Sequence, residues 1–196
     1  AHIDGKVLFV PQAIPGDVVD VQVSRIRRGY MEGNVTRLIT PSPHRKEPFC
    51  CHFGRCGGCK WQALPYSMQL QYKQQQVEDQ LLRIGRLDLP GISPILGAEK
   101  TIEYRNKLEY TFSNRRWILS EEEPESLSEK DRCGVGFHIG AMFDKVLDIT
   151  KCHLQREPTN ELRLFVREYA LNHNLSFFDL RAQQGFMRTM IVRTTS

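Results

Sequence analysis

Residues 50–59, with the sequence CCHFGRCGGC, place four cysteines and three glycines within ten positions. Cys56 and Cys59 are separated by a glycine pair, and glycine tolerates the positive φ angles of a tight turn that would bring both sulfurs to one side. Cys50, six positions before Cys56, offers a third thiolate. Cys50 and Cys51 are adjacent, and a disulfide between them would strain the backbone. The segment therefore indicates a site that uses several sulfurs at once.

The chain has six cysteines and no export signal, and in a reducing compartment clustered cysteines are more often metal ligands or catalytic groups than disulfides. A zinc site of the common kind would use a second close pair downstream, whereas Cys133 and Cys152 stand alone. An iron–sulfur cluster often uses three neighbouring cysteines and one remote thiolate. Cys152, in DITKCHLQ, suits that remote position, and Cys133 competes for it. The residues alone favour the cluster and leave zinc open.

Two other roles for this segment have less support. A thioredoxin-like redox pair at Cys56 and Cys59 would need a strand and a helix around it, and a proline-rich linker precedes these cysteines instead. His52 could offer a nitrogen to zinc, but one residue after Cys51 we expect it to pack or to hydrogen-bond.

The composition of the chain is that of an ordinary globular protein. It has 196 residues, of which 40% are hydrophobic and 26% charged, and its net charge of +4 is too small to identify a nucleic-acid binder. No apolar run approaches the ~20 residues that span a bilayer, and no signal peptide opens the chain. Both ends, AHIDGKVLFV and FMRTMIVRTTS, read as strands already under way. We therefore expect a piece of a longer, cytoplasmic protein.

Residues 1–40 contain three short β-type runs, KVLFV, DVVDVQVSRIR and YMEGNVTRLI, separated by the turn signals PGD and RG. Closely spaced short strands predict a small β-barrel, of the oligonucleotide-binding type. Four arginines lie on or beside these strands, namely Arg25, Arg27, Arg28 and Arg37. They form either a solvated edge that discourages aggregation or a surface that faces RNA.

Residues 41–90 form a linker, the cysteine segment and a helix. Apolar side chains at Tyr66, Leu70, Val77, Leu81 and Ile84 recur on one helical face, which predicts a helix from about 65 to 85 whose stripe packs in a core. Pro65 suits the first turn of this helix, and Gly85 suits a left-handed stop.

Residues 91–196 predict a mixed α/β domain, so the chain as a whole belongs to the α+β class. The runs YRNKLEYTFSNRRWIL and VGFHIGAMFDKVLDI read as extended, and the acidic stretch 120–132 between them reads as a flexible excursion without a function. Residues 157–174 predict a helix with Leu162, Phe165, Val166 and Tyr169 inward. Residues 175–194 predict two strands around a Gln-Gly turn, in a domain left open at its C-terminal edge.

Several pieces of the chain occur together in one known family. The pattern C-x-H-F-G-x-C-G-G-C is followed by Y-x-x-Q-L-x-x-K (Tyr66, Gln69, Leu70, Lys73), then by YRNK, by GF and by D-I-x-x-C-x-L. This combination resembles the RNA uracil-5-methyltransferase family, and most closely its iron–sulfur 23S ribosomal RNA enzymes that use S-adenosylmethionine. The match runs through most of the chain in the family's order.

The resemblance implies a role for each part of the chain. Residues 1–40 would be a partial TRAM domain, and residues 91–196 the central domain that helps to hold the RNA. The four ligands of a 4Fe–4S cluster would be Cys50, Cys56, Cys59 and Cys152. Cys51 falls on a variable position of the pattern, and Cys133 matches no ligand of the family.

The family's catalytic part is a Rossmann-like domain further along the chain, where a cysteine attacks C6 of the uracil and the methyl group comes from S-adenosylmethionine. None of those motifs occurs in these 196 residues, so we expect no catalytic residue, no S-adenosylmethionine site and no activity of this portion alone. Two alternatives remain at this stage. One is a zinc-stapled RNA-binding module without methyltransferase activity, and the other is a redox protein whose cluster transfers electrons.

Enzymes of this family must open an RNA loop and extrude the target base, which requires cationic side chains for the phosphates. Arg105 and Lys107 in YRNK are the first candidates for RNA contact, followed by Arg115 and Arg116. The alternative is that these charges are only solvated. We expect Trp117 and Phe137 to pack in the core rather than to stack on bases.

Overall fold

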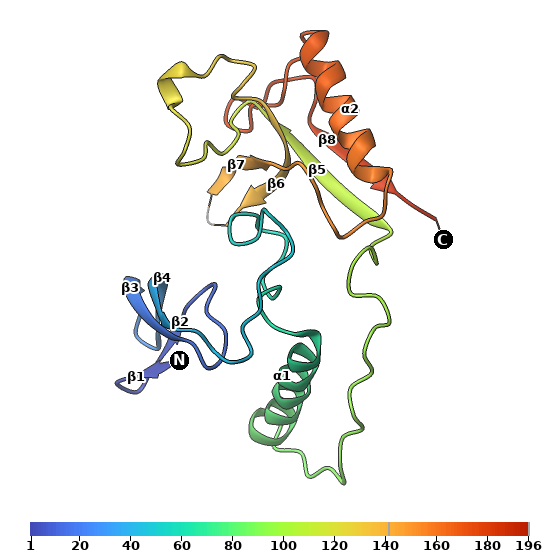
Figure 1. The fold of residues 1–196 in the computed structure, drawn as a ribbon. Helices are drawn as coiled ribbons and strands as arrows, with labels where there is room; N and C mark the ends of the chain where they lie inside the picture. The colour runs from blue at the N-terminus through green and yellow to red at the C-terminus, as the bar shows by residue number, and fades with distance from the viewer. Residues whose placement is uncertain (141, 196) are drawn as a thin grey trace. The chain divides into compact units, whose positions relative to one another are not determined.

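The computed structural model describes residues 1–140 and 142–195. The chain divides into two compact units, which Figure 1 shows as ribbons. The first unit contains Ala1–Phe49 and Lys60–Glu99, and the second contains Cys50–Cys59 and the chain from Lys100 onward. The cysteine segment therefore belongs to the second unit, although chain of the first unit lies on both sides of it in the sequence.

The described part of the first unit contains a four-stranded sheet in the order β1-β2-β4-β3. β2 and β4 are parallel, and the other pairs are antiparallel. The strands are β1 (His2–Ile3), β2 (Lys6–Phe9), β3 (Val18–Ile26) and β4 (Tyr30–Thr40). The three longer strands coincide with the three runs that the sequence predicts.

A buried carboxylate fixes the turn between β2 and β3. Gly16 adopts φ +91°, and the Asp17 side chain, which has no exposed surface, accepts hydrogen bonds from the backbone N–H groups of Ile14 (2.8 Å) and Ser42 (2.9 Å). Arg45 Nε donates to the same carboxylate at 3.0 Å. The hydrogen bonds from Arg45, aided by those from the backbone, lower the pKa of Asp17 to about 2. The linker after β4 is thus bonded to this turn.

Helix α1 (Tyr66–Asp79) follows the cysteine segment and continues into a π-helical turn, Gln80–Ile84. The Gln69 amide donates to the carbonyl oxygens of Trp61 (3.0 Å) and Leu64 (2.9 Å) and so fixes the entry to the helix. The prediction that the apolar stripe of this helix packs in a core is wrong, because no residue of α1 is buried and Ile84 is 80% exposed. Within the first unit the helix contacts irregular segments, where Gly97 approaches Leu70 and Lys73 lies over the Trp61 ring.

The described part of the second unit contains an antiparallel sheet in the order β7-β6-β5-β8, with α2 (Thr159–Asn172) running alongside it (Figure 1). The strands are β5 (Lys107–Ser113), β6 (Gly134–Ile139), β7 (Met142–Asp148) and β8 (Thr189–Arg193). The core contains Tyr110, Phe112, Val135, Leu147 and Cys152, with Trp117 and Phe137 packed against it as expected. These two units confirm the predicted α+β class.

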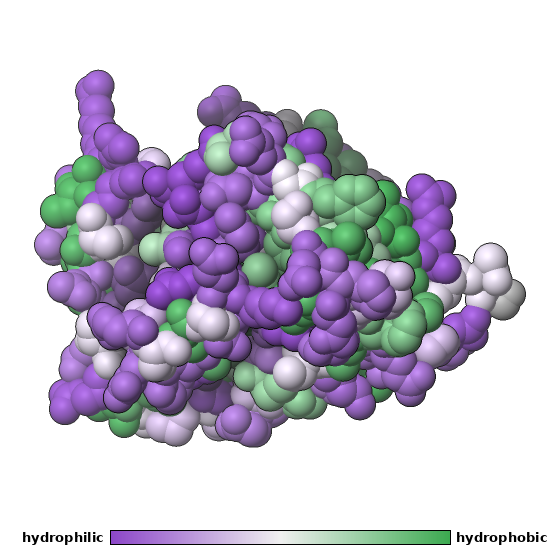
Figure 2. Space-filling view, turned by 90° about the horizontal axis from the view of Figure 1, so that it is seen from above, coloured by the Kyte–Doolittle hydropathy of each residue, from purple (hydrophilic) through white to green (hydrophobic). Residues whose placement is uncertain are grey.

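The inward face of α2 differs from the prediction. Leu162 is 46%, Phe165 67% and Tyr169 49% exposed, whereas Val166 packs against the core as predicted. The buried positions of this helix are instead Thr159, Asn160, Arg163 and Ala170. Asn160 and Arg163 face inward, where their side chains hydrogen-bond to the backbone of residues 149–152. Figure 2, which views the molecule from above, shows apolar patches among hydrophilic side chains on that face.

The acidic stretch 120–132 is bonded to the rest of the second unit, contrary to the flexible excursion that its composition predicts. It contains a 3₁₀ turn, Pro124–Ser126. Glu122 pairs with Arg116 through both carboxylate oxygens, and the hydrogen bonds from Arg116 lower the pKa of Glu122 to about 2. Glu121 pairs with Arg55 of the cysteine segment at 3.0 Å.

The region 175–194 contains one regular strand, β8, rather than the two that the sequence predicts. The earlier run pairs only through isolated bridges, Phe177 with Met187 and Asp179 with Gln184. Among the described residues, no helix has both the length and the apolar character needed to cross a membrane.

Candidate metal centre

The cysteine segment is an irregular loop closed by its own backbone. Phe53 N–H donates to the Cys50 carbonyl oxygen at 3.0 Å, and Cys56 N–H donates to the His52 carbonyl oxygen at 2.8 Å. Gly54 adopts φ +85°, which is the left-handed conformation that favours glycine. Gly58 N–H donates to Cys56 Sγ at 3.4 Å. The glycines therefore allow the turns and also supply a backbone donor to sulfur.

Two close contacts hold this loop against the sheet of the second unit. Thr150 N–H donates to His52 Nε2 at 3.0 Å, two residues before Cys152. A Cβ at Gly57 would lie 2.6 Å from the His138 carbonyl oxygen in β6, so only glycine permits this approach. Burial and, secondarily, the charge of Arg163 lower the pKa of His52, which keeps its ring neutral and able to accept. His52 is a hydrogen-bonding residue, as predicted.

Cys152 lies in the core of the second unit with 8% of its surface exposed. Its backbone is held on both sides by one side chain. Cys152 N–H donates to Asn160 Oδ1 at 2.7 Å, and Asn160 Nδ2 donates to the Cys152 carbonyl oxygen at 3.1 Å. Asn160 itself is 5% exposed and is oriented by Glu157, to which Nδ2 donates at 2.8 Å. The position of this sulfur is thus set by α2.

The structure brings the thiols of Cys50, Cys56, Cys59 and Cys152 into electrostatic range of one another. Burial raises the pKa of the Cys56 thiol, and the thiols of Cys59, Cys152 and Cys50 raise it further. Burial likewise raises the pKa of Cys152, with added contributions from Cys59 and Cys50. The pKa of Cys50 is raised by burial and by its neighbours Cys51 and Cys59. The thiolates of Cys50, Cys56 and Cys152 are therefore disfavoured in the absence of a bound cation.

These four residues have the donor chemistry that an iron–sulfur cluster uses, since they are thiols gathered in a half-buried site with a backbone N–H directed at one sulfur. In residues 1–140 and 142–195, no group of three or more His, Cys, Asp or Glu side chains is arranged so that it could hold a metal ion. A bound cation would neutralise the negative charge of the thiolates that these cysteines form when they act as ligands.

The two remaining cysteines lie apart from this group or at its edge. Cys51 is exposed. Cys133 is half-buried, and its Sγ donates to the Glu129 carbonyl oxygen at 3.5 Å. Burial raises the pKa of Cys133, and the charged groups that act on it are Arg167, Glu129 and Asp148 rather than the other thiols. Of the two candidates for the remote ligand, Cys152 is the one that the structure brings to the cysteine loop.

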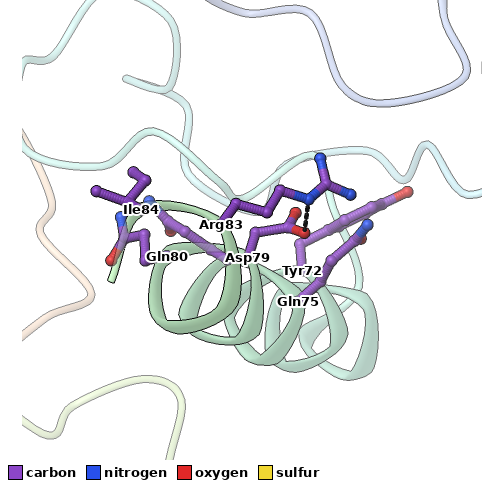
Figure 3. A pocket seen from close by; sticks show the side chains of 7 residues that line it. Tyr72, Gln75, Asp79, Gln80, Arg83 and Ile84 are labelled. Carbon is purple, nitrogen blue, oxygen red and sulfur yellow. Dashed lines mark ion pairs between the residues drawn. The ribbon is translucent and has the colours of Figure 1, made fainter. Parts of the chain in front are cut away.

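A shallow hollow also lies on the helical segment of the first unit, with a volume of about 320 Å³ (Figure 3). Seven residues line it, including Tyr72, Asp79 and Arg83, and all of them come from α1 and the π-helical turn that follows. Asp79 and Arg83 form an ion pair of 3.1 Å across one turn of this segment. The hollow is a groove on one helical surface and contains none of the predicted site residues.

Residues 1–36 of the chain match the TRAM domain family. An uncharacterized RNA methyltransferase of Porphyromonas gingivalis is 53% identical over 200 residues, covering 100% of this chain and 43% of that protein. A second, from Bacteroides thetaiotaomicron, is 52% identical over 196 residues with the same coverage. The chain belongs to a family of RNA methyltransferases. It spans about two fifths of the length of these curated relatives.

A solved structure supports the fold of this family member. The tRNA (uracil-54, C5)-methyltransferase of Pyrococcus abyssi, in complex with S-adenosyl-L-homocysteine, matches 95% of this chain and 38% of its own. The TM-score is 0.61 at 23% sequence identity, which shows a shared fold. The TRAM match confirms the TRAM domain predicted at the N-terminus.

The four basic residues predicted to contact RNA all belong to the second unit of this methyltransferase family member. Arg105 is exposed and forms no ion pair within the described residues. The other three are paired: Lys107 with Glu109 at 2.9 Å, Arg115 with Asp179 at 3.3 Å, and Arg116 with Glu122. Arg116 is the most buried of these three, with 12% of its side chain exposed. RNA contact by all four residues stays a prediction.

Sequence reasoning missed Asn160 and Arg163, the two buried polar residues that organise Cys152. Their signal is a polar stripe in which Thr159 and Asn160 lie four and three residues before Arg163, on one face of the predicted helix. An apolar stripe on the opposite face, including Phe165, masked it. A helix with two such stripes does not reveal from its sequence which one is buried.

Proposed function

We propose that this chain is part of an S-adenosylmethionine-dependent RNA (uracil-C5) methyltransferase that acts on 23S ribosomal RNA in the cytoplasm. In this portion, Cys50, Cys56, Cys59 and Cys152 hold a 4Fe–4S cluster, and the surrounding domains bind and position the RNA. The observation that carries the proposal is the hydrogen bond from Thr150 to His52, which holds the cysteine loop close to the segment of the buried Cys152, whose thiol lies within electrostatic range of loop thiols.

The chemistry of the thiols supports this ligand set. Burial and the neighbouring thiols oppose free thiolates at Cys50, Cys56 and Cys152, whereas coordination to iron would stabilise the deprotonated form. When bound, the cluster supplies a covalent staple between the loop and the segment before α2. His52 and Gly57 hold the loop close to Thr150 and to β6, on the side where Cys152 lies.

The RNA-positioning role is supported by the TRAM match and by exposed cations in both units. In the first unit, Arg25 and Arg37 lie on β3 and β4 with side chains 56% and 71% exposed. In the second unit, Arg105 precedes β5 and is exposed. These side chains can bind phosphate oxygens, which orients an RNA without reading its sequence.

The test uses the full-length protein purified without oxygen. We expect about four iron and four sulfide ions per chain, as a 4Fe–4S cluster requires. Cys152→Ser should lose most of this iron, and Cys133→Ser, the matched control, should retain it. A content of about one zinc ion per chain and no iron would refute the cluster and indicate a zinc site instead.

Methyl transfer from labelled S-adenosylmethionine to 23S ribosomal RNA and to tRNA transcripts then tests the substrate. We expect 5-methyluridine in the ribosomal RNA. Product in tRNA alone would refute the ribosomal assignment, and no 5-methyluridine in either RNA would refute the proposed reaction.

A further inference from the structure

Arg163 is a fully buried cation on the inner face of α2, with none of its surface exposed. Its guanidinium donates to the carbonyl oxygens of Ile149 and Thr150, the latter at 3.0 Å, and to Asn160 Oδ1 at 3.3 Å. Its Cζ lies 5.3 Å from the centre of the Tyr110 ring. Every one of these partners is neutral.

No Asp or Glu oxygen of the described residues lies within 4.0 Å of Arg163; Asp148 acts on its charge from further away and is itself paired with Arg167. The next arginine along α2 provides the contrast, because Arg167 pairs with Asp148 at 2.8 Å. In addition, Arg163 Nε and the Tyr110 hydroxyl are buried without a hydrogen-bond partner in the described chain. Removing an unpaired charge from water is costly, so buried charges are normally paired.

The surroundings of Arg163 point to where its counter-charge belongs. Two of its partners, Ile149 and Thr150, lie three and two residues before Cys152, and the third, Asn160, holds the Cys152 backbone on both sides. The Cys152 thiol also lies within electrostatic range of the guanidinium. A negative group bound at this sulfur would therefore face a cation that the protein has already desolvated.

We propose that Arg163 is the built-in counter-charge of a thiolate-ligated iron–sulfur cluster and positions Cys152 for ligation. This inference rests on the cluster in the proposed function. Four thiolates bring more negative charge than the iron–sulfur core neutralises, so the ligated cluster is an anion. Residues around a metal site that orient a ligand or supply charge commonly change metal affinity by about 10–100-fold when mutated.

This role has a signature that a merely structural arginine lacks. Without the cluster, Arg163→Met removes an unpaired buried charge together with its hydrogen bonds to three acceptors, two effects of opposite sign, so its net effect on the stability of the metal-free protein should be small. With the cluster bound, the same substitution removes an attractive charge and should destabilise the protein. The effect of the substitution therefore changes between the two forms of the protein.

The experiment compares Arg163→Met, Arg163→Lys and the control Arg167→Met in full-length protein prepared without oxygen. Urea unfolding is measured with the cluster present and after its removal, and iron release is timed with a ferrous chelator. We expect Arg163→Met to release iron about 10–100-fold faster than the wild type. Arg163→Lys, which keeps the charge, should stay nearer the wild type. Arg167→Met should lower stability equally in both forms.

Any of four outcomes would overturn the inference. Iron release at the wild-type rate in Arg163→Met refutes the counter-charge while leaving the cluster intact. Equal destabilisation of both forms assigns Arg163 to the fold alone. Absence of iron from the wild type refutes the cluster itself, and with it both proposals. If Arg163→Met does not fold, Arg163→Lys and Arg163→Gln are compared instead, and equal iron release by these two overturns the role of charge.

Discussion

Replacing Asn160 by alanine tests how α2 holds Cys152. The substitution deletes the acceptor for Cys152 N–H and the donor to its carbonyl oxygen, two bonds of 2.7 and 3.1 Å in a site where Asn160 is 5% exposed. A buried polar group left unpaired costs about 1–3 kcal/mol. Two such groups, partly relieved by entering water, predict a loss of about 2–4 kcal/mol in the free energy of unfolding.

The assay is equilibrium unfolding in urea of protein from which metal has been removed, so that cluster binding does not contribute. Asn172→Ala is the matched control, because Asn172 is on the same helix and exposed. We expect that control to change stability by less than about 0.5 kcal/mol, as is usual for surface substitutions. A loss below about 1 kcal/mol for Asn160→Ala, or one equal to the control, would show that the protein does not depend on these bonds.

Three further predictions concern other parts of the chain. Asp17→Asn should lower the free energy of unfolding by about 2.5 kcal/mol at pH 7, because a lowered pKa stabilises the folded state above the unfolded pKa. The loss should be about half of this at pH 3, as the pH falls toward the folded pKa of about 2. Urea unfolding at both pH values checks it, and a loss independent of pH contradicts it. Gly57→Ala should displace the loop and reduce bound iron, whereas Gly140→Ala, with nothing within 4 Å of the added carbon, should not; iron analysis decides. Arg105→Ala should weaken RNA binding and lower the slope of log affinity against log salt by about one, and more so than Arg116→Ala, whose guanidinium is engaged by a carboxylate; unchanged binding with Arg105→Ala argues against contact there.

The parts of the fold that could be predicted are those specified locally. β2, β3 and β4 follow from apolar residues between turn signals. The PGD sequence predicts a turn, and the turn is present, with Gly16 in the left-handed conformation. The helix at 66–79 follows from its periodicity in the same way. Each of these features depends on neighbours within a few residues, which the sequence displays directly.

The parts that could not be predicted depend on distant partners. Gly85 has φ −70° and continues the right-handed turn, although its residue type suits a left-handed stop. Glu122 is held by hydrogen bonds from Arg116. Arg163 is buried where its guanidinium donates to carbonyl oxygens around residue 150. The type of a residue does not reveal a partner that is distant in the sequence. The acidic stretch 120–132 is therefore predicted to be flexible, and the apolar side of the second helix is predicted to face inward.

The placement of the cysteine loop explains why a cluster would matter to this fold. The loop belongs to the second unit, yet the chain before Cys50 and after Cys59 belongs to the first. Joining Cys59 to Cys152 closes a loop of about 93 residues, and in the chain-entropy treatment a cross-link of about that span is worth about 4–5 kcal/mol. The non-covalent bonds seen between loop and sheet, mainly through His52 and Thr150, contribute about 1 kcal/mol each. A cluster would therefore supply more of the loop's stability than these hydrogen bonds, and its loss should loosen residues 50–59 before it affects the sheet.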